Sequence, residues 1–174
     1  MEGPAPEFEI RSAVIRISDR NSFLDALRTV MRKHHATIIC FNADNMAGRR
    51  HAESAVSHAL RSFSKGAPIA KTLEVEALLY AAGTRQCTEA AIFGIHHGEN
   101  RAYVCCIPPD SAIWDALTAL MHFVDDTWDQ LDPAKIGRLK QLFAITEEEV
   151  IAADGISRLQ DLVIERVALL DAYR

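Results

Sequence analysis

The residues best suited to contact a ligand lie at a helical corner, in the stretch GTRQ at positions 83–86. The apolar run before it predicts a helix over 73–82, and a second helix is expected from the corner to Phe93. Arg85 would then lie beside free backbone N–H groups, which bind anions readily. Its guanidinium can bind phosphate through two bonds, and Gln86 can donate and accept toward a base or a ribose. An ion pair between Arg85 and Glu89 is the alternative explanation.

A second candidate surface is one face of the helix expected over 45–64. Apolar residues cluster on the opposite face at about 100° per residue. Three cations alternate with small hydroxyl residues on the polar side: Arg50, Ser54, Ser57, Arg61 and Lys65. Such a stripe could approach a phosphate backbone, although a solvated polar face is the common alternative. We predict that this stripe and the Arg85 corner converge on one concave groove.

No catalytic set is recognisable in the sequence. It contains no G-x-S-x-G elbow and no Gly-rich phosphate loop. The four cysteines are expected to be free, buried thiols of a reducing cytosol, with Cys87 on the inward side of its helix. The seven histidines form no ligand set, so neither a metal nor a cofactor is predicted. An enzyme that uses Cys87 and a nearby histidine is the least favoured alternative, because buried cysteines are usually inert.

Composition indicates an ordinary soluble protein. The 174 residues suit a single domain over 1–174, of which residues 1–6 are expected to be flexible. Hydrophobic residues make up 49% and charged residues 25%, and the formal net charge is −5. This charge argues against a nonspecific nucleic-acid coat protein but permits a local basic patch. The chain has neither an apolar run of roughly 20 residues nor a secretory signal, so a cytoplasmic protein without membrane contact is expected.

The order of patterns predicts an α+β fold, with a small mixed sheet of about three or four strands packed against roughly seven helices. Strands are expected at 8–17, 37–41 and 102–107, with a possible short edge strand at 127–131. Helices are expected at 21–33, 45–64, 73–82, 84–93, 111–124, 133–143 and 158–173. Thr146 and Glu149 have the spacing of a capping box.

The last helix carries more apolar residues than one buried face requires: Leu159, Leu162, Val163, Ile164, Val167, Leu169 and Leu170. Part of this surface could bind a partner by helix packing. Complete burial within the domain explains the same pattern equally well.

Several stretches resemble a known family, the Cgi-type subunit of the KEOPS (EKC) complex, to which the PRPK-binding protein belongs. They are FNAD at 41–44, AGRRH at 47–51, IAKTLEVE at 69–76 and LYAAGTRQ at 79–86, followed by CTEAAIFGI at 87–95. The resemblance is strongest from about residue 36 to 107, and the GTRQ run is close to the archaeal form. Cys87 stands where the family usually has an aliphatic residue.

The resemblance implies a non-enzymatic function. Members of the family bind and activate the atypical kinase/ATPase subunit of the complex. They also help to hold tRNA, in archaea by its 3′ CCA end, for synthesis of threonylcarbamoyl-adenosine. Through the kinase they join the threonylcarbamoyl-transferase subunit, which performs the transfer, and the small dimerisation subunit.

The resemblance also gives the candidate residues their expected partners. The expected tRNA contacts are Arg49, Arg50, His51, Arg61, Lys65, Lys71, Arg85 and Gln86. An arginine or His51 would supply any stacking on bases. The last helix becomes the expected kinase-binding face, through Ile164, Val167, Ala168 and Asp171. A purely protein-interaction subunit that leaves RNA to its partners is the alternative, and the net negative charge favours it.

Overall fold

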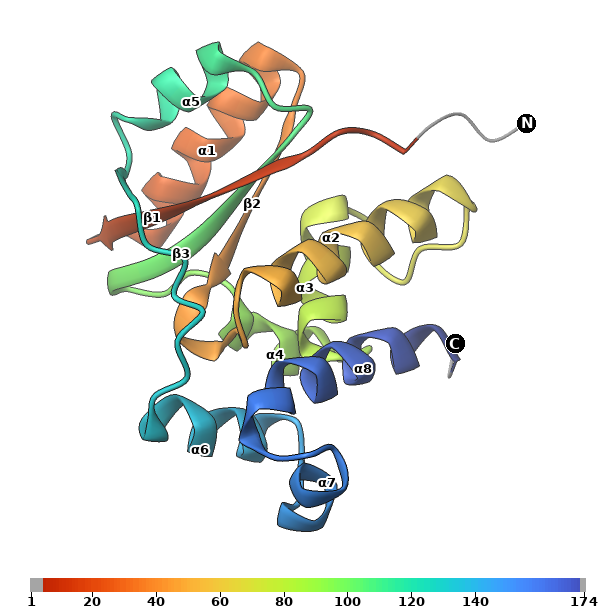
Figure 1. The fold of residues 1–174 in the computed structure, drawn as a ribbon. Coiled ribbons are helices and arrows are strands. Elements are labelled where there is room, and N and C mark those ends of the chain that lie inside the picture. Colours follow the sequence, from red (N-terminus) through yellow and green to blue (C-terminus); the bar gives the residue numbers. More distant parts are fainter. Residues whose placement is uncertain (1–4, 173–174) are drawn as a thin grey trace.

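The fold was analysed in a computed structural model that describes residues 5–172 (Figure 1). Four strands form one sheet in the order β2-β3-β1-β4. They are β1 (Glu9–Ile17), β2 (Thr37–Asn42), β3 (Gly98–Ile107) and β4 (His122–Val124). Together with the helices they confirm the predicted α+β class. The prediction about residues 1–6 falls mostly outside the described range.

All three strand pairs are antiparallel, so the predicted mixed sheet is wrong. The helix between the first two strands resembles a crossover that would place them side by side and parallel. Instead, β3 inserts between β1 and β2 and runs antiparallel to both. β1 and β2 therefore point the same way without being neighbours.

The eight α-helices of the described chain cover the two faces of the sheet. They are α1 (Arg20–His34), α2 (Arg49–Ser64), α3 (Leu73–Ala82), α4 (Cys87–Ala90), α5 (Ser111–Leu117), α6 (Pro133–Leu142), α7 (Glu147–Ala152) and α8 (Leu159–Ala172). Short 3₁₀ turns lie between these elements: η1 (Ala43–Asn45) before α2, η2 (Ala91–Phe93) after α4 and η3 (Ile156–Arg158) before α8. Figure 1 shows α1 and α5 on one side of the sheet and the other helices on the opposite side.

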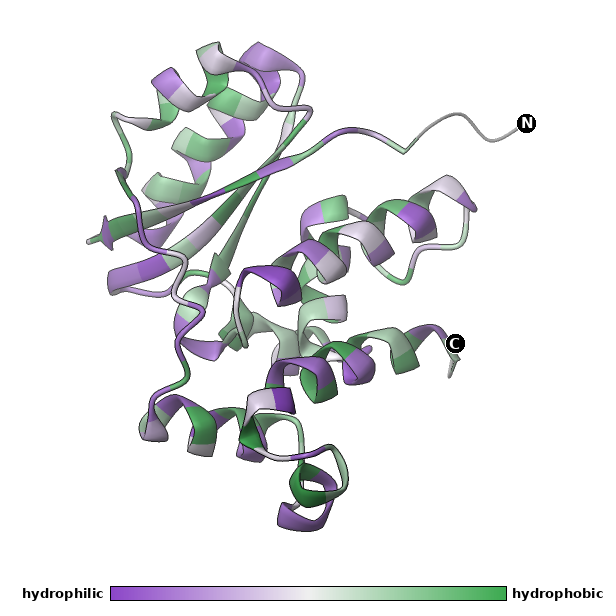
Figure 2. Ribbon diagram, viewed as in Figure 1, coloured by the Kyte–Doolittle hydropathy of each residue, from purple (hydrophilic) through white to green (hydrophobic). Residues whose placement is uncertain are grey.

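Each face of the sheet has its own hydrophobic core, because successive side chains of a strand point to opposite faces. On β3, Val104 and Cys106 face α1 and α5, whereas Tyr103 and Cys105 face the larger helical layer. Both faces of β3 are therefore buried, which explains its nearly continuous apolar sequence. Figure 2 shows green hydrophobic residues along the strands and on the helices packed against them.

Some predicted boundaries differ from the structure. Residues 127–131 form no strand, and the edge strand is β4. The helix expected over 111–124 ends at Leu117, so that the following residues can reach β1 and pair as β4. The helix expected over 84–93 is only the short α4 followed by η2. The capping box of Thr146 and Glu149 at the start of α7 is confirmed.

The start of α2 depends on Gly48. This residue has φ of 145° and ψ of −177°, a conformation that favours glycine. A Cβ atom there would lie 2.2 Å from Gln160 Nε2 and 2.6 Å from Asp129 Oδ1. The Asp129 carboxylate accepts from the backbone N–H of Arg49 at 2.8 Å. The α2 start is therefore fixed by a side chain from the loop before α6, and the helix begins at Arg49 rather than at residue 45.

We expect Gly48→Ala to destabilise the fold by about 2 kcal/mol or more, because it adds backbone strain and a steric clash. Gly137→Ala is the matched control, since Gly137 lies inside α6 with nothing within 4 Å of its Cβ position. The control should be neutral or slightly stabilising. Urea unfolding measures both changes, and equal effects of the two substitutions would contradict this account of the α2 start.

Candidate functional site

The corner at positions 83–86 presents an unengaged arginine. Gly83 ends α3 in the left-handed conformation, with φ of 65° and ψ of 33°. Arg85 and Gln86 are exposed. Glu89 accepts a hydrogen bond from Thr84 Oγ1 at 2.8 Å, so the Arg85–Glu89 ion pair considered from the sequence does not form. Among the described residues, Arg85 makes neither a hydrogen bond nor an ion pair through its side chain.

A groove of about 390 Å³ opens beside this corner, between α1 and the α3–α4 segment, with β2 at its base. We call it the α1–α3 groove. Leu24 and Met31 of α1, Cys40 of β2 and Leu78 of α3 supply apolar lining. The groove is large enough for a small organic group such as a nucleobase.

Polar groups of both signs surround the α1–α3 groove. Arg20 and Arg28 of α1 and Glu74 of α3 line it. Lys71 and Gln86 directly precede two further lining residues, Thr72 and Cys87. Sequence reasoning missed the contribution of α1, although its amphipathic pattern placed charged residues next to the apolar face that covers the sheet.

Cys87 lies on the surface, contrary to the inward position predicted for it. The prediction assumed a long helix over 84–93, but α4 has only four residues, and its first one faces the α1–α3 groove. The other three cysteines are buried or half-buried. Burial raises the pKa of Cys40 and Cys106 to about 12 and that of Cys105 further, so these thiols stay protonated at neutral pH. No histidine is among the residues that line the groove.

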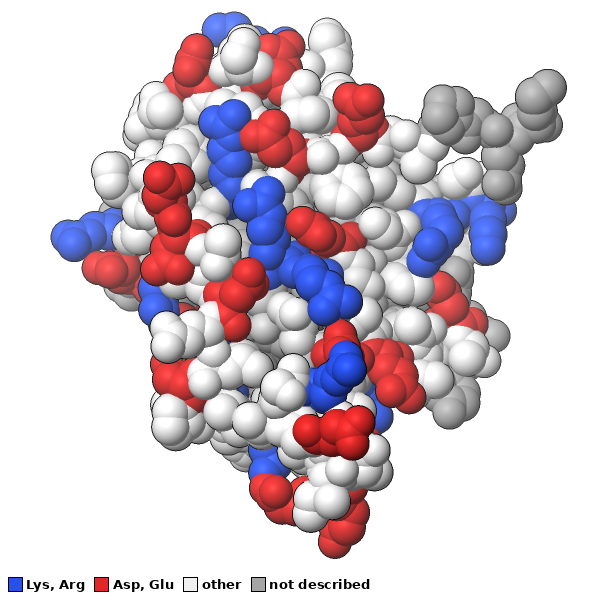
Figure 3. All heavy atoms as spheres, viewed as in Figure 1, with Lys and Arg blue, Asp and Glu red and all other residues white. Residues whose placement is uncertain are grey.

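Two of the three cations of the α2 stripe are engaged within the protein, Arg50 by α8 and Arg61 by a neighbour on α2 itself. Arg50 Nη1 lies 3.1 Å from Asp161 Oδ1 and 3.3 Å from Gln160 Oε1. Hydrogen bonds from Arg158 and then Arg50 hold the pKa of the Asp161 carboxyl below its usual range. Arg61 Nη2 lies 2.9 Å from His58 Nδ1. Figure 3 shows the cations of this view as a broken band with acidic side chains on both sides.

The single groove predicted between the stripe and the corner is absent from the described structure. Arg50 meets α8 at Asp161, whereas Gly83 packs against the backbone of Arg166. These α8 positions are about 7.5 Å apart along the helix and about 140° apart around it. Arg50 and Arg85 therefore flank α8, and none of the three main hollows of the described chain is lined by both.

His51 is removed from the set of surface contacts because it is fully buried. Its Nδ1 accepts from the backbone N–H of Ala47 at 3.0 Å, and its Nε2 lies 2.8 Å from the carbonyl oxygen of Ala81. Its ring also packs edge-on against Phe93 and Phe143. The sequence showed an Arg-Arg-His run, but α2 turns its third residue into the core.

Some of the other expected RNA contacts are held by internal contacts, and others have side chains that could bind a ligand. The Arg49 side chain is tied to Glu53 and to the carbonyl oxygen of Ile10. Lys65 and Lys71 are exposed and, within residues 5–172, their side chains have no ion pair or hydrogen bond. The cations that remain available are thus Lys65, Lys71 and Arg85.

The solvent-facing side of α8 holds three of the four residues expected to bind the kinase. Ile164 is half-buried, and Ala168 and Asp171 are exposed. Val167 is fully buried, so its prediction as a surface contact is wrong. It shares the inward stripe of α8 with Leu159, Val163 and Leu170, at the spacing that packs against α2 and α3.

The end of α8 is joined to the stripe of α2 by a polar network. Asp171 Oδ2 lies 2.8 Å from His58 Nδ1, and the hydroxyl of Tyr80 donates to Asp171 Oδ1. The rings of His58 and Tyr80 are stacked, with centroids 5.2 Å apart. The exposed faces of α2 and α8 therefore form one continuous surface, which we call the α2–α8 surface.

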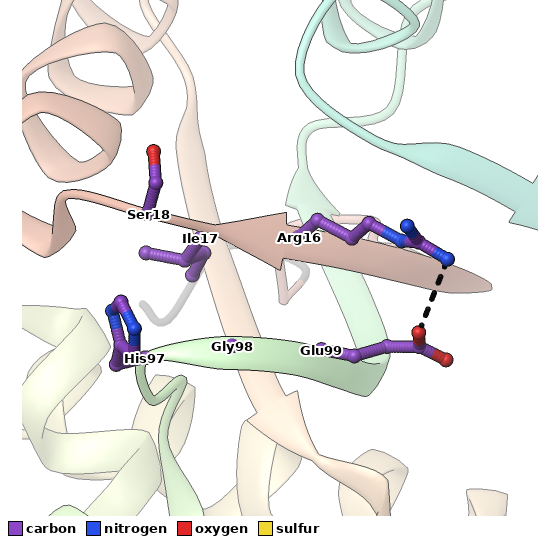
Figure 4. Close-up of a pocket in the computed structure, with 6 residues that line it drawn as sticks. All are labelled: Arg16, Ile17, Ser18, His97, Gly98 and Glu99. Carbon is purple, nitrogen blue, oxygen red and sulfur yellow. Dashed lines mark ion pairs between the residues drawn. The ribbon is translucent and has the colours of Figure 1, made fainter.

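A further hollow, at the end of β1 and β3, holds an exposed ion pair between Arg16 and Glu99 at 3.4 Å (Figure 4). His97 and Ser18 lie at its other end, and the hollow is shallow and open. No group of three or more His, Cys, Asp or Glu residues in the described part of the chain is placed to hold a metal ion. Within the same range, every helix is too short or too polar to cross a membrane.

Comparison with known proteins defines the class to which this fold and these surfaces belong, the kinase-binding regulatory proteins. The family model described as "Kinase binding protein CGI-121" matches residues 15–171, so the chain belongs to that family. The chain is also similar to the "Regulatory protein Cgi121" of Methanocaldococcus jannaschii, with 29% identity over 132 residues. That alignment covers 75% of this chain and 80% of the relative.

The burial of His51 predicts a pH-dependent stability. Burial lowers the pKa of His51 from 6.5 to about 4 in the folded protein. Between these values the unfolded chain binds a proton that the folded chain does not, so the free energy of unfolding should decrease as the pH falls. The loss should reach about 3 kcal/mol at most.

Urea unfolding from neutral pH to about pH 4.5 measures this loss. His51→Asn should flatten the dependence relative to the wild-type protein, because the variant has no imidazole to protonate. Parallel curves for the two proteins would show that His51 titrates normally and would contradict its buried, neutral state.

Proposed function

We propose that the chain is a non-catalytic, cytoplasmic subunit of the KEOPS complex. It binds and activates the atypical kinase/ATPase subunit and holds the 3′ CCA end of tRNA for threonylcarbamoyl-adenosine modification. Through the kinase it joins the threonylcarbamoyl-transferase subunit and the small dimerisation subunit. Membership of the kinase-binding family supports the regulatory role.

The α1–α3 groove is the observation that carries the RNA part of the proposal. A single strand needs surfaces on which bases can stack and cations that meet its phosphates. The groove offers apolar lining for a base. Lys71 and Gln86 directly precede the lining residues Thr72 and Cys87 in the chain, and Arg85 lies two residues before Cys87. The side chains of Lys71 and Arg85 can bind phosphate without first breaking an ion pair, because no acid of the described chain pairs with them.

We assign the remaining stripe residues to the kinase instead. Arg50 and Arg61 lie on the α2–α8 surface, where acids of α8 already offset part of their charge. A phosphate would have to compete with these carboxylates, whereas a protein partner can match alternating charges. The small residues Ser54, Ser57 and Ala168 leave the surface low enough for close packing.

A purely protein-interaction subunit is the second candidate. It is favoured by the internal engagement of Arg49, Arg50 and Arg61 and by the net charge of −5. In that case the groove would serve a protein rather than a nucleic acid, and RNA binding would belong to the partner subunits.

Binding of intact tRNA and of tRNA lacking CCA should separate these candidates. We expect the truncated form to bind at least about tenfold more weakly, a difference of about 1.4 kcal/mol. Equal affinity for both forms would defeat the proposed 3′-end site.

Single substitutions should then locate the phosphate contacts. Lys71→Ala and Arg85→Ala should each lower the slope of log K against log salt by about one unit. Arg61→Ala is the control and should leave the slope nearly unchanged. A larger effect of Arg61→Ala would place the RNA on the α2–α8 surface.

Kinase binding can be tested on the exposed face of α8. Ala168→Glu adds bulk and charge on the exposed face of α8 and should weaken the complex with the kinase subunit by about tenfold or more. Ala152→Glu is the matched control, because Ala152 is exposed on α7. Calorimetric titration of the kinase measures both variants, and unchanged affinity of Ala168→Glu would remove α8 from the interface.

A further inference from the structure

Glu76 of α3 is a buried carboxylate that has no counter-ion. Its exposed fraction is 0%, and no cation of the described chain forms an ion pair with it. Taking a carboxylate out of water is costly unless donors replace the lost hydration. Three donors do so: the hydroxyl of Ser62 at 2.8 Å, the N–H of Ile69 at 3.0 Å and the N–H of Ala70 at 2.6 Å.

These donors show what the carboxylate holds in place. Ser62 belongs to α2, whereas Ile69 and Ala70 belong to the loop that connects α2 with α3. The same segment returns to α3 at Thr72, whose side chain accepts from the N–H of Val75 at 3.3 Å. Lys71 is therefore flanked by two residues whose backbone or side chain is fixed by α3.

An apolar residue at position 76 would leave the hydroxyl of Ser62 and the N–H groups of Ile69 and Ala70 without their acceptor, which would destabilise the loop. The specific effect of Glu76 is on the conformation of the loop, because its two oxygens fix consecutive amides, those of Ile69 and Ala70.

We propose that Glu76 is a positioning residue that holds Lys71 at the mouth of the α1–α3 groove for contact with an RNA phosphate. This inference rests on the proposed function, because Lys71 contacts RNA only if the groove receives it. Glu76 itself never touches the nucleic acid. It acts through the backbone of Ile69 and Ala70.

The sign of the effect of Glu76→Gln separates positioning from simple electrostatics. Removing a negative charge near a phosphate should strengthen RNA binding if the charge alone matters. Loss of the loop conformation should weaken it, because a Gln side chain keeps one acceptor oxygen and presents an NH₂ group to a backbone N–H. The positioning role predicts weaker binding of intact tRNA and a salt slope lower by about one unit, as for Lys71→Ala.

The experiment measures tRNA affinity against salt for the wild-type protein, Glu76→Gln, Lys71→Ala and the double variant. Glu165→Gln is the matched control for the charge change, since Glu165 is exposed on α8. We expect Glu76→Gln to have no further effect once Lys71 is absent. Unchanged or tighter binding by Glu76→Gln, or an equal loss in both backgrounds, overturns the inference.

Two additional measurements keep the result interpretable. Hydrogen exchange should show faster exchange of the Ile69 and Ala70 amides in Glu76→Gln than in the wild-type protein, and unchanged protection overturns the positioning role without reference to RNA. If Glu76→Gln does not fold, Ser62→Ala provides a second test. It removes one donor and should shift RNA affinity in the same direction by a smaller factor.

The results also separate the inference from the proposed function. Absence of salt-sensitive tRNA binding by the wild-type protein overturns both, whereas tRNA binding that is unaffected by substitution of Glu76 overturns only the inference.

Discussion

The burial of α3 is the constraint on which the arrangement of the candidate site depends. This helix packs against α2, α8 and the sheet, and Leu79, Tyr80 and Ala81 are completely buried. Its ten residues form a rod about 15 Å long. Lys71 lies just before one end and Arg85 just after the other. Because α3 is fixed by its packing, the spacing of the backbone positions of these two residues is set by the core, while their exposed side chains stay adjustable.

Paired and unpaired charges lie on different parts of the surface. The α2–α8 surface carries basic and acidic side chains in contact with one another, through the ion pair of Arg50 with Asp161 and the hydrogen bond between His58 and Asp171. The two ends of α3, by contrast, present cations that have no partner within the described chain. An acidic protein can thus offer a local cationic site beside a neutralised surface, and each suits a different kind of partner.

The sequence predicted those features that depend on local patterns. The α+β class, the ends of α3 at Thr72 and Gly83, and the capping box of Thr146 all follow from periodicity and cap chemistry. The mixed sheet was wrong because strand order depends on the insertion of β3, which no local pattern records. His51 was misplaced because it was grouped with Arg49 and Arg50, although helical spacing puts it on the same side as Ala55 and Ala59. Val167 was misplaced because the apolar residues of α8 cover more than one face, so the pattern did not show which of them point inward.

The candidate site was only partly predictable. Arg85 and Gln86 were recognisable because they occupy a corner that needs no such residues. The α1–α3 groove was not, because it forms where α1, β2 and α3 meet from distant parts of the chain. Glu76 was equally hidden, since an acid near a helix start is an ordinary cap residue until its burial is known.

Selective alkylation of Cys87 tests the central claim most directly, namely that the α1–α3 groove receives the 3′ end of tRNA. Cys87 is exposed in the groove, and Cys40, which also lines it, is half-buried. The raised pKa of Cys40, Cys105 and Cys106 keeps these three thiols protonated at neutral pH, so Cys87 should react first. We predict that saturating intact tRNA slows the alkylation of Cys87 and that tRNA lacking CCA does not. Equal alkylation rates with saturating intact tRNA and with no RNA would contradict the account.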